Sequence, residues 1–323
     1  MSSSVGPRLA SSYCDYTYDM NKIDTDKSTR PIGIFDSGIG GLTVARAIAR
    51  NLPDESILYF GDTLRFPYGP RDLAEVQDFV RQVGSWLVQR EVKLIIIACN
   101  TATAAGLEIA QREFNIPIIG VVEPGARAAV QATRARRVGV IGTVGTIESA
   151  AYTRALRSLD AGITVFSAAT PRFVEIAEKG LRVNHDVVPD FLAEDSFITI
   201  DPAYLEIARD YLIPLKRCGV DTLVLGCTHF PLLQPLIESV MGPGVSIVSS
   251  AEESAREIAV TLERRGQKAL PGSPAAYSFA TTALDVEEFI DLGSHIFGHQ
   301  VKQVEQVSIE ELEQSRYKRS SCR

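Results

Sequence analysis

Two cysteines occupy matching places in the sequence, each at the end of a short apolar run and directly before polar residues. Cys99 ends the run LIIIAC, and Cys227 ends the run LVLGC. A thiolate is a competent base and a thiol a competent acid. A pair of them could remove a proton from one face of a carbon and return one to the opposite face, as racemisation requires. The polar residues that follow the cysteines are Asn100, Thr101, Thr228 and His229.

Other interpretations of these cysteines stay open. A cysteine at a strand end is commonly a small buried apolar residue. A redox dithiol is disfavoured because the chain has no C-x-x-C. A zinc site is disfavoured because Cys99, Cys227 and His229 supply only three donors in an unusual spacing. A Cys–His arrangement of the protease type leaves the second cysteine unexplained.

Two turns carry further polar groups. Asp36 and Ser37 begin the segment DSGIGGL, whose small residues leave backbone N–H groups free for an anion. Asp36 could meet an ammonium group or a thiol, or cap the following helix. The turn FPYG (66–69) could offer the Tyr68 hydroxyl and backbone N–H groups, such as that of Gly69, to a carboxylate. It could equally be a plain turn.

Glu178 and His229 are the remaining titratable candidates. Glu178 lies in the stretch PRFVEIAEKG, which has a helical pattern, and His229 follows Cys227 by two positions. Pyridoxal phosphate needs a lysine for its Schiff base. None of the lysines follows a strand end that bears glycine or cysteine. We therefore expect neither a cofactor nor a metal.

The elements that must position these residues alternate between strands and helices. This alternation predicts an α/β fold with mainly parallel sheets covered by helices, in which ligands bind beyond the carboxyl ends of the strands. Strands are expected over residues 32–35, 57–60, 94–98, 116–122, 137–141, 164–167, 222–225 and 245–248. Helices are expected over residues 42–51, 74–90, 102–114, 125–133, 147–159, 204–217 and 251–265.

The chain also resembles itself. Residues 33–48 (GIFDSGIGGLTVARAI) parallel residues 139–156 (GVIGTVGTIESAAYTRAL). VKLIIIACNT parallels VDTLVLGCTH, which gives Cys99 and Cys227 equivalent positions. Two pseudo-symmetric α/β halves that face each other would bring both thiols into one cleft.

Composition excludes several classes of protein. The 323 residues carry a net charge of −7, which argues against nucleic acid or an anionic membrane as a partner. No apolar run approaches the ~20 residues of a membrane-spanning helix. The first 30 residues lack the apolar core of a signal peptide, and the five cysteines form no disulfide framework. We expect a cytoplasmic protein with a flexible extension over 1–30 and a flexible tail over 311–323.

Taken together, these segments resemble the glutamate racemases, cofactor-independent enzymes that supply D-glutamate for peptidoglycan. The resemblance spans roughly residues 31–310. It rests on IGIFDSGIGGLTV, GDTLRFPYG, ACNTATA, IPIIGVVEPG, VIGTVGT and LGCTHFPLL.

The resemblance implies roles for individual residues. Cys99 and Cys227 match the two acid/base residues, while Asp36, Glu178 and His229 match groups that tune the thiols. Near Glu178 the family commonly reads C-P-x-F-V-P-x-V-E, whereas this chain has ATPRFVEIAE, so Glu175 is a competitor. Residues that match substrate-contacting positions are Asp36, Ser37, Tyr68, Gly69, Asn100, Thr101, Thr228 and His229.

The resemblance also implies two domains with the active site between them. The first comprises residues 31–122 plus 249–310, and the second residues 123–248. The substrate would be L- or D-glutamate, and we expect a homodimer. A racemase for aspartate or another acidic amino acid is the alternative activity. A catalytically silent binding protein of the same fold is the alternative from another class.

Overall fold

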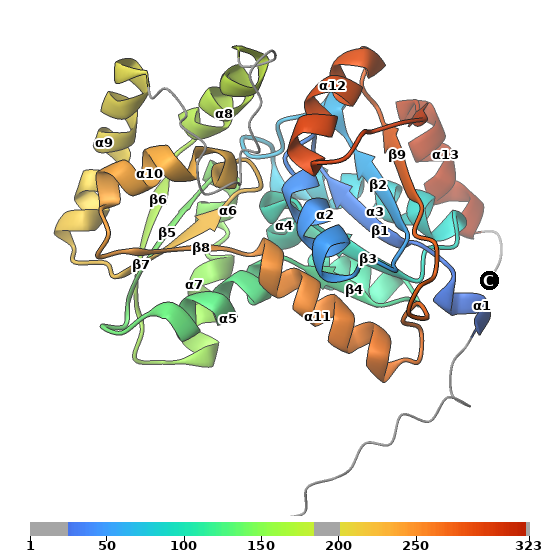
Figure 1. Cartoon of the computed structure of the whole chain (residues 1–323), viewed down its shortest axis with the longest axis horizontal. Helices are drawn as coiled ribbons and strands as arrows, with labels where there is room; N and C mark the ends of the chain where they lie inside the picture. Colours follow the sequence, from blue (N-terminus) through green and yellow to red (C-terminus); the bar gives the residue numbers. More distant parts are fainter. Residues whose placement is uncertain (1–24, 184–200, 321–323) are drawn as a thin grey trace, which may run out of the picture.

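The computed structural model describes residues 25–183 and 201–320, and Figure 1 shows their arrangement. The expected extension therefore falls mostly outside the described residues. Its last part forms a short helix, α1 (Thr25–Ser28). The carbonyl of Ser28 accepts a hydrogen bond of 2.7 Å from the buried Lys93, which ties this helix to the protein.

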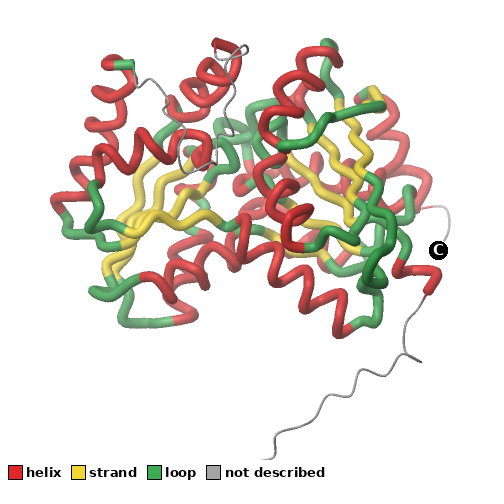
Figure 2. The backbone as a smooth tube through the Cα atoms, in the orientation of Figure 1, coloured by secondary structure: helices red, strands yellow, loops and turns green. Residues whose placement is uncertain are grey.

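Two parallel sheets form the framework, and Figure 2 shows them in opposite halves of the molecule. The first sheet has the order β10-β9-β2-β1-β3-β4 and the second the order β6-β5-β7-β8. The predicted α/β fold class is confirmed. The strands of the first sheet are β1 (Ile32–Asp36), β2 (Ile57–Gly61), β3 (Leu94–Ile97), β4 (Ile118–Gly120), β9 (Tyr277–Thr281) and β10 (Val304–Gln306). Those of the second are β5 (Arg137–Gly142), β6 (Thr164–Ala169), β7 (Thr222–Gly226) and β8 (Ser246–Ser249).

The central strands β1 and β2 are buried along their whole length because helices cover both of their faces. In β1, Ile34 belongs to one buried cluster and its neighbour Phe35 to another. β2 behaves likewise, with Tyr59 in the first cluster and Phe60 in the second. A parallel strand buried on both faces loses the alternation of apolar and polar residues. The continuous apolar runs of the sequence follow from this burial.

The larger helices pack in sets on the two sheets. On one face of the first sheet, α3 (Leu73–Gln89) packs against α4 (Asn100–Glu113) and α13 (Ile309–Ser320). On the other face, α2 (Leu42–Asn51) packs against α11 (Ala251–Arg264) and α12 (Val286–Phe297). The second sheet is covered by α5 (Val122–Ala132), α6 (Val144–Glu148), α7 (Ala151–Leu159), α8 (Arg172–Val183), α9 (Pro202–Arg217) and α10 (Gln234–Met241).

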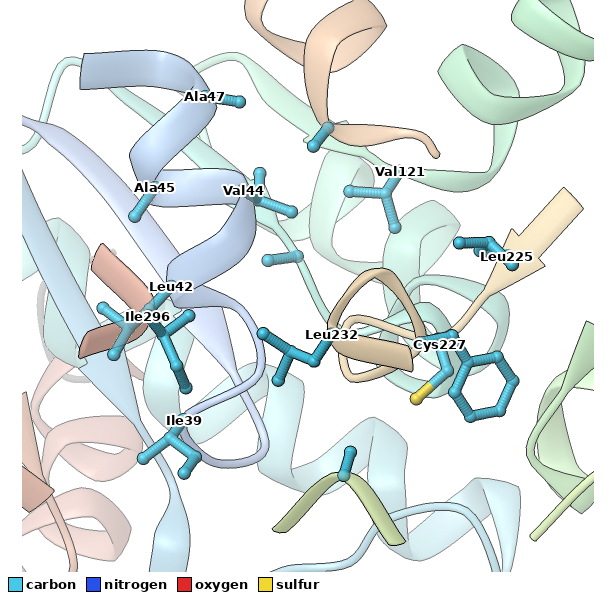
Figure 3. Close-up of a cluster of buried hydrophobic side chains, with 14 of the residues drawn as sticks. Ile39, Leu42, Val44, Ala45, Ala47, Val121, Leu225, Cys227, Leu232 and Ile296 are labelled. Carbon is cyan, nitrogen blue, oxygen red and sulfur yellow. The ribbon is translucent and has the colours of Figure 1, made fainter. Parts of the chain in front are cut away.

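The two halves share a hydrophobic core. α11 contacts α2 in the first half and α5 in the second, and Figure 1 shows it running between them. One contiguous buried cluster contains Leu42 from α2, Val121 before α5 and Leu225 from β7. Cys227 belongs to the same cluster, and Figure 3 shows it near Leu225, with Leu232 between it and Leu42. The position of Cys227 is therefore fixed by packing that spans both halves.

Several elements differ from the sequence-based expectation. The single helix expected over 147–159 is two helices, α6 and α7, because Ala150 adopts a left-handed conformation with φ +52° between them. Strands β9 and β10 and helix α12 were not anticipated. The flexible tail expected from residue 311 is wrong for most of its length, since α13 extends to Ser320. Leu312 is fully buried there, and Trp86 donates a hydrogen bond of 3.0 Å to Glu311.

No helix in the described ranges has the length and apolar character needed to cross a membrane.

Candidate active site

Both cysteines lie at the carboxyl ends of central strands and line one cavity. Cys99 follows β3 and caps the N-terminus of α4, whereas Cys227 directly follows β7. Both thiols are buried, and the cavity that they line is small, with a volume of about 20 Å³. Its lining consists of Ser37, Phe66, Pro67, Tyr68, Gly69, Cys99, Asn100, Thr101, Thr143, Val174, Gly226, Cys227, Thr228 and His229.

Cys99 lies in surroundings that favour the neutral thiol. Burial raises its pKa to about 12, and the negative charges of Asp36 and Cys227 act in the same direction. Its sulfur accepts a hydrogen bond of 3.5 Å from the backbone N–H of Ala102 and also interacts with the Ser37 side chain. These contacts lower the pKa of Cys99, but they only partly offset the effect of burial. Cys99 is therefore protonated at neutral pH.

Cys227 has a different neighbour, the imidazole of His229. The sulfur lies 3.9 Å from His229 Nδ1, and the other ring nitrogen, Nε2, lies 3.3 Å from Glu178 Oε1. Burial acts to lower the pKa of His229, but its hydrogen bonds to Cys227 and Glu178 outweigh burial and raise that pKa to about 10. His229 is thus an imidazolium that lies between Cys227 and Glu178. Such a cation stabilises the thiolate form of its sulfur neighbour.

Asp36 lies behind the cavity and joins the two halves. It is fully buried and accepts hydrogen bonds from the backbone N–H of Gly38 at 3.0 Å and from Thr228 Oγ1 at 3.3 Å. Burial raises the pKa of its carboxyl group above the usual value, although the charge of His229 opposes the shift. The hydroxyl of Thr228 is therefore held toward the first half.

The turn that contains Tyr68 and Gly69 rests on a buried ion pair. Asp62 accepts hydrogen bonds from Arg65 Nε at 2.6 Å, from the Tyr68 hydroxyl and from Thr282 Oγ1 at 2.9 Å. The sequence suggests the Tyr68 hydroxyl as a donor to a ligand carboxylate. In the structure this hydroxyl donates to Asp62 instead. The carbonyl of Gly69 accepts a hydrogen bond of 2.9 Å from Gly145 of the other half.

Asn100 and Thr101 begin α4, and both bind residues of the second half. Asn100 Oδ1 accepts a hydrogen bond of 2.7 Å from the hydroxyl of Tyr152. Thr101 Oγ1 lies 2.8 Å from Thr143 Oγ1. Since the N-terminus of a helix favours anions, the start of α4 is a suitable place for a substrate carboxylate.

A sequence profile of the Asp/Glu/Hydantoin racemase family matches residues 40–258. The chain belongs to this family. It is 45% identical over 277 residues to the glutamate racemase of Leifsonia xyli, an alignment that covers 86% of this chain and 95% of the relative.

Solved structures of racemases share the fold. The RacE1 isoform of glutamate racemase from Bacillus anthracis has a TM-score of 0.78 at 41% identity, covering 87% of this chain and 98% of that one. Glutamate racemase from Francisella tularensis, solved in complex with D-glutamate, has a TM-score of 0.76 at 31% identity, covering 87% and 98%. As a member of the racemase family with such relatives, this protein is an isomerase that acts as a racemase.

The structure of this racemase brings together all the residues singled out from the sequence. All of them line the cavity except Asp36 and Glu178, which contact lining residues from behind. Glu175, the competitor of Glu178, is exposed one turn away on α8. Sequence reasoning missed Val174, Gly226 and Tyr152. The first two carry no chemical signal, and Tyr152 appeared only within the repeated segment.

Among the described residues, no group of three or more His, Cys, Asp and Glu side chains is placed to hold a metal ion.

Proposed function

We propose that this racemase interconverts L- and D-glutamate by proton transfer between two thiols, with no cofactor. The observation that carries the proposal is the unequal environment of the two sulfurs in one cavity. Cys99 is buried beside Asp36 and is held as a thiol, whereas Cys227 lies next to the imidazolium of His229. We therefore assign Cys99 as the acid and Cys227 as the base of the first proton transfer.

The proposed reaction has two proton transfers. The Cys227 thiolate takes the α-proton, which forms an S–H bond and leaves the C–H electron pair as a carbanion conjugated with the carboxylate. The Cys99 thiol then donates its proton to the opposite face of the same carbon. The enzyme emerges with Cys99 as thiolate and Cys227 as thiol, the state that acts on the other enantiomer. His229 and Glu178 stabilise the charge at Cys227.

Neutral donors would hold the two carboxylates of glutamate. No arginine or lysine is among the described residues that line the cavity. The candidates are the side chains of Ser37, Asn100 and Thr101, the backbone N–H of Gly69, and the Thr228 hydroxyl. Thr228 would turn its proton from Asp36 to the substrate. Such donors bind an anion without leaving a buried cation unpaired when the site is empty. The relatives named above as glutamate racemases support this choice of substrate.

The wider setting of the reaction belongs to the same proposal. We propose that the enzyme acts in the cytoplasm as a homodimer and supplies D-glutamate for peptidoglycan synthesis. Its two domains would comprise residues 31–122 with 249–310, and residues 123–248.

The test is the decay of circular dichroism of D- and L-glutamate and of D- and L-aspartate, with no added cofactor. We expect both glutamate enantiomers to reach the racemate, with activity retained after dialysis against a chelator. A double variant, Cys99→Ser with Cys227→Ser, is the control for contaminating racemases. Racemisation of aspartate but not glutamate would assign the other acidic amino acid. Turnover only after addition of pyridoxal phosphate or zinc would refute the cofactor-free reaction.

A further inference from the structure

Tyr152 bridges the two halves of the molecule directly behind the cavity. It is the second residue of α7 and is 2% exposed. Two glycines leave room for it: a Cβ at Gly226 would lie 3.2 Å from its ring, and a Cβ at Gly125 would lie 3.1 Å from its hydroxyl oxygen. Since Gly226 immediately precedes Cys227, the ring packs against the strand end that carries this thiol. Close packing on two sides holds the ring in one orientation.

The hydroxyl of Tyr152 connects two polar side chains. It donates a hydrogen bond of 2.7 Å to Asn100 Oδ1, and the side chain of Ser250 also binds it. A phenolic hydroxyl has a single proton to donate. With that proton directed to Asn100, the hydroxyl accepts from Ser250. The carboxamide oxygen of Asn100 is then occupied, and its NH₂ group remains available to the cavity that Asn100 lines.

We propose that Tyr152 is a positioning residue of the racemase, which orients the carboxamide of Asn100 so that its NH₂ group faces the substrate. This inference rests on glutamate as substrate, because only a carboxylate requires a donor at this point. The reversed carboxamide would present an oxygen atom to the carboxylate and repel it. A free asparagine side chain samples both orientations, whereas the hydrogen bond from the Tyr152 hydroxyl to Oδ1 favours the orientation that turns the NH₂ group to the substrate.

The hydrogen bond between Tyr152 and Asn100 also joins the two halves of the molecule. Asn100 belongs to α4 beside the first sheet, and Tyr152 to α7 beside the second. The orienting hydrogen bond therefore exists only while the halves lie together as they do here. Binding of the carboxylate is in this way linked to the juxtaposition of the two thiols.

Tyr152→Phe removes the hydroxyl and keeps the ring. We expect KM for glutamate to rise about 3- to 10-fold, the effect of one hydrogen bond, with a smaller change in kcat. Tyr211→Phe is the matched control, since Tyr211 lies on α9 in the same half and its ring contacts Phe173. We expect the control to retain wild-type constants. An unchanged KM in Tyr152→Phe would overturn the proposal.

A double-mutant cycle separates positioning from general stabilisation. If Tyr152 acts through Asn100, adding Tyr152→Phe to Asn100→Ala should not raise KM further. Additive effects would show that Tyr152 acts by another route and would overturn the proposal. Asn100→Asp is a second variant, which keeps the acceptor for Tyr152 but replaces the donor. It should fold as the wild type does and lose glutamate binding, and undiminished binding would also overturn the proposal.

One readout does not depend on activity. The side-chain NH₂ resonances of Asn100, assigned by their loss in Asn100→Ala, should shift in Tyr152→Phe and not in Tyr211→Phe. Unchanged resonances would refute the orienting contact. If the wild type failed to racemise glutamate while the resonances shifted, the substrate assignment would be wrong and the contact between Tyr152 and Asn100 would stand.

Discussion

His229 Nε2 lies 3.3 Å from Glu178 Oε1, so a carboxylate contacts the imidazole on the side away from Cys227. The opposite ring nitrogen lies 3.9 Å from the sulfur of Cys227. One ring thus connects a carboxylate on α8 with a thiol at the end of β7. Because the ring is 2% exposed, solvent does little to screen these interactions.

Glu178→Gln should lower the pKa of His229. The wild-type pKa is raised to about 10 by Cys227 and Glu178 together, and glutamine removes the charge of one partner. Titration of the His229 ring by NMR measures the shift. Glu175→Gln, an exposed carboxylate on the same helix, is the matched control and should leave the titration unchanged. An equal pKa in Glu178→Gln and the wild type would contradict the coupling.

The same pair makes stability depend on pH. The folded-state pKa of His229, about 10, lies above the ~6.5 of an exposed histidine, so protonation favours the folded state. This contribution is complete below pH ~6.5 and is lost as pH rises through about 10. Glu178→Gln should therefore lower the free energy of unfolding most at pH 6, and the difference from wild type should shrink toward pH 10. Urea denaturation at several pH values tests this. If the loss of unfolding free energy in Glu178→Gln grew with pH, protonation of His229 would not be what stabilises the folded state.

Cys99→Ser and Cys227→Ser should each reduce racemisation by at least about 100-fold, because loss of a positioned acid or base typically costs 10²–10⁴-fold. A serine hydroxyl is too weak an acid and too weak a base at neutral pH to replace the thiol. Cys218→Ser is the control, since Cys218 caps α9 outside the cavity. Racemisation rates in both directions are the measurement. Near-normal rates in either active-site variant would exclude proton transfer by two thiols.

The chemistry-bearing strand ends could be predicted from sequence, but the contacts between the halves could not. Apolar runs followed by polar residues identify Cys99 and Cys227, because parallel sheets bind ligands at that edge. The contact of Tyr152 with Asn100 depends on how α7 lies against α4, and tertiary packing alone determines that. α13 escaped prediction because its sequence, IEELEQSRYKRS, is mostly polar and owes its place to a few contacts such as those of Leu312.

Asp62→Asn should destabilise the protein and impair substrate binding. The neutral carboxamide would leave the guanidinium of Arg65 buried without its charge partner, and breaking a buried ion pair costs about 3–5 kcal/mol. The turn that carries Tyr68 and Gly69 would lose its anchor, so KM should rise as well. Urea denaturation and steady-state kinetics measure both effects.

Asp78→Asn is the control for this substitution. It breaks the ion pair of 3.0 Å between Asp78 and Arg81, in which the Asp78 side chain is 47% exposed. Exposed ion pairs contribute about 0–1 kcal/mol to the free energy of unfolding. If Asp62→Asn were no more destabilising than Asp78→Asn, the anchoring role of Asp62 would be wrong.

Gly40→Ala should reduce kcat while the fold is retained. A Cβ at Gly40 would lie 2.5 Å from His229 Nδ1 and 2.6 Å from Thr228 Oγ1, so the imidazole must move away from its place beside Cys227. Gly244→Ala is the control, because no atom lies within 4 Å of its Cβ position. Circular dichroism spectra test whether the fold is retained, and initial rates of racemisation measure the activity. Wild-type rates in Gly40→Ala would show that the position of His229 is not critical.

The first sheet obtains two strands from the far end of the chain, since β9 pairs with β2 and β10 with β9. During translation the amino-terminal part emerges first, so every strand of the second sheet leaves the ribosome before β9 does. Until then β2, an apolar strand, presents an unpaired edge that can template aggregation. A nascent chain arrested before residue 277 should therefore aggregate rather than persist as a soluble inactive fragment. The edge of β2 therefore needs protection by chaperones until the last part of the chain has been synthesised.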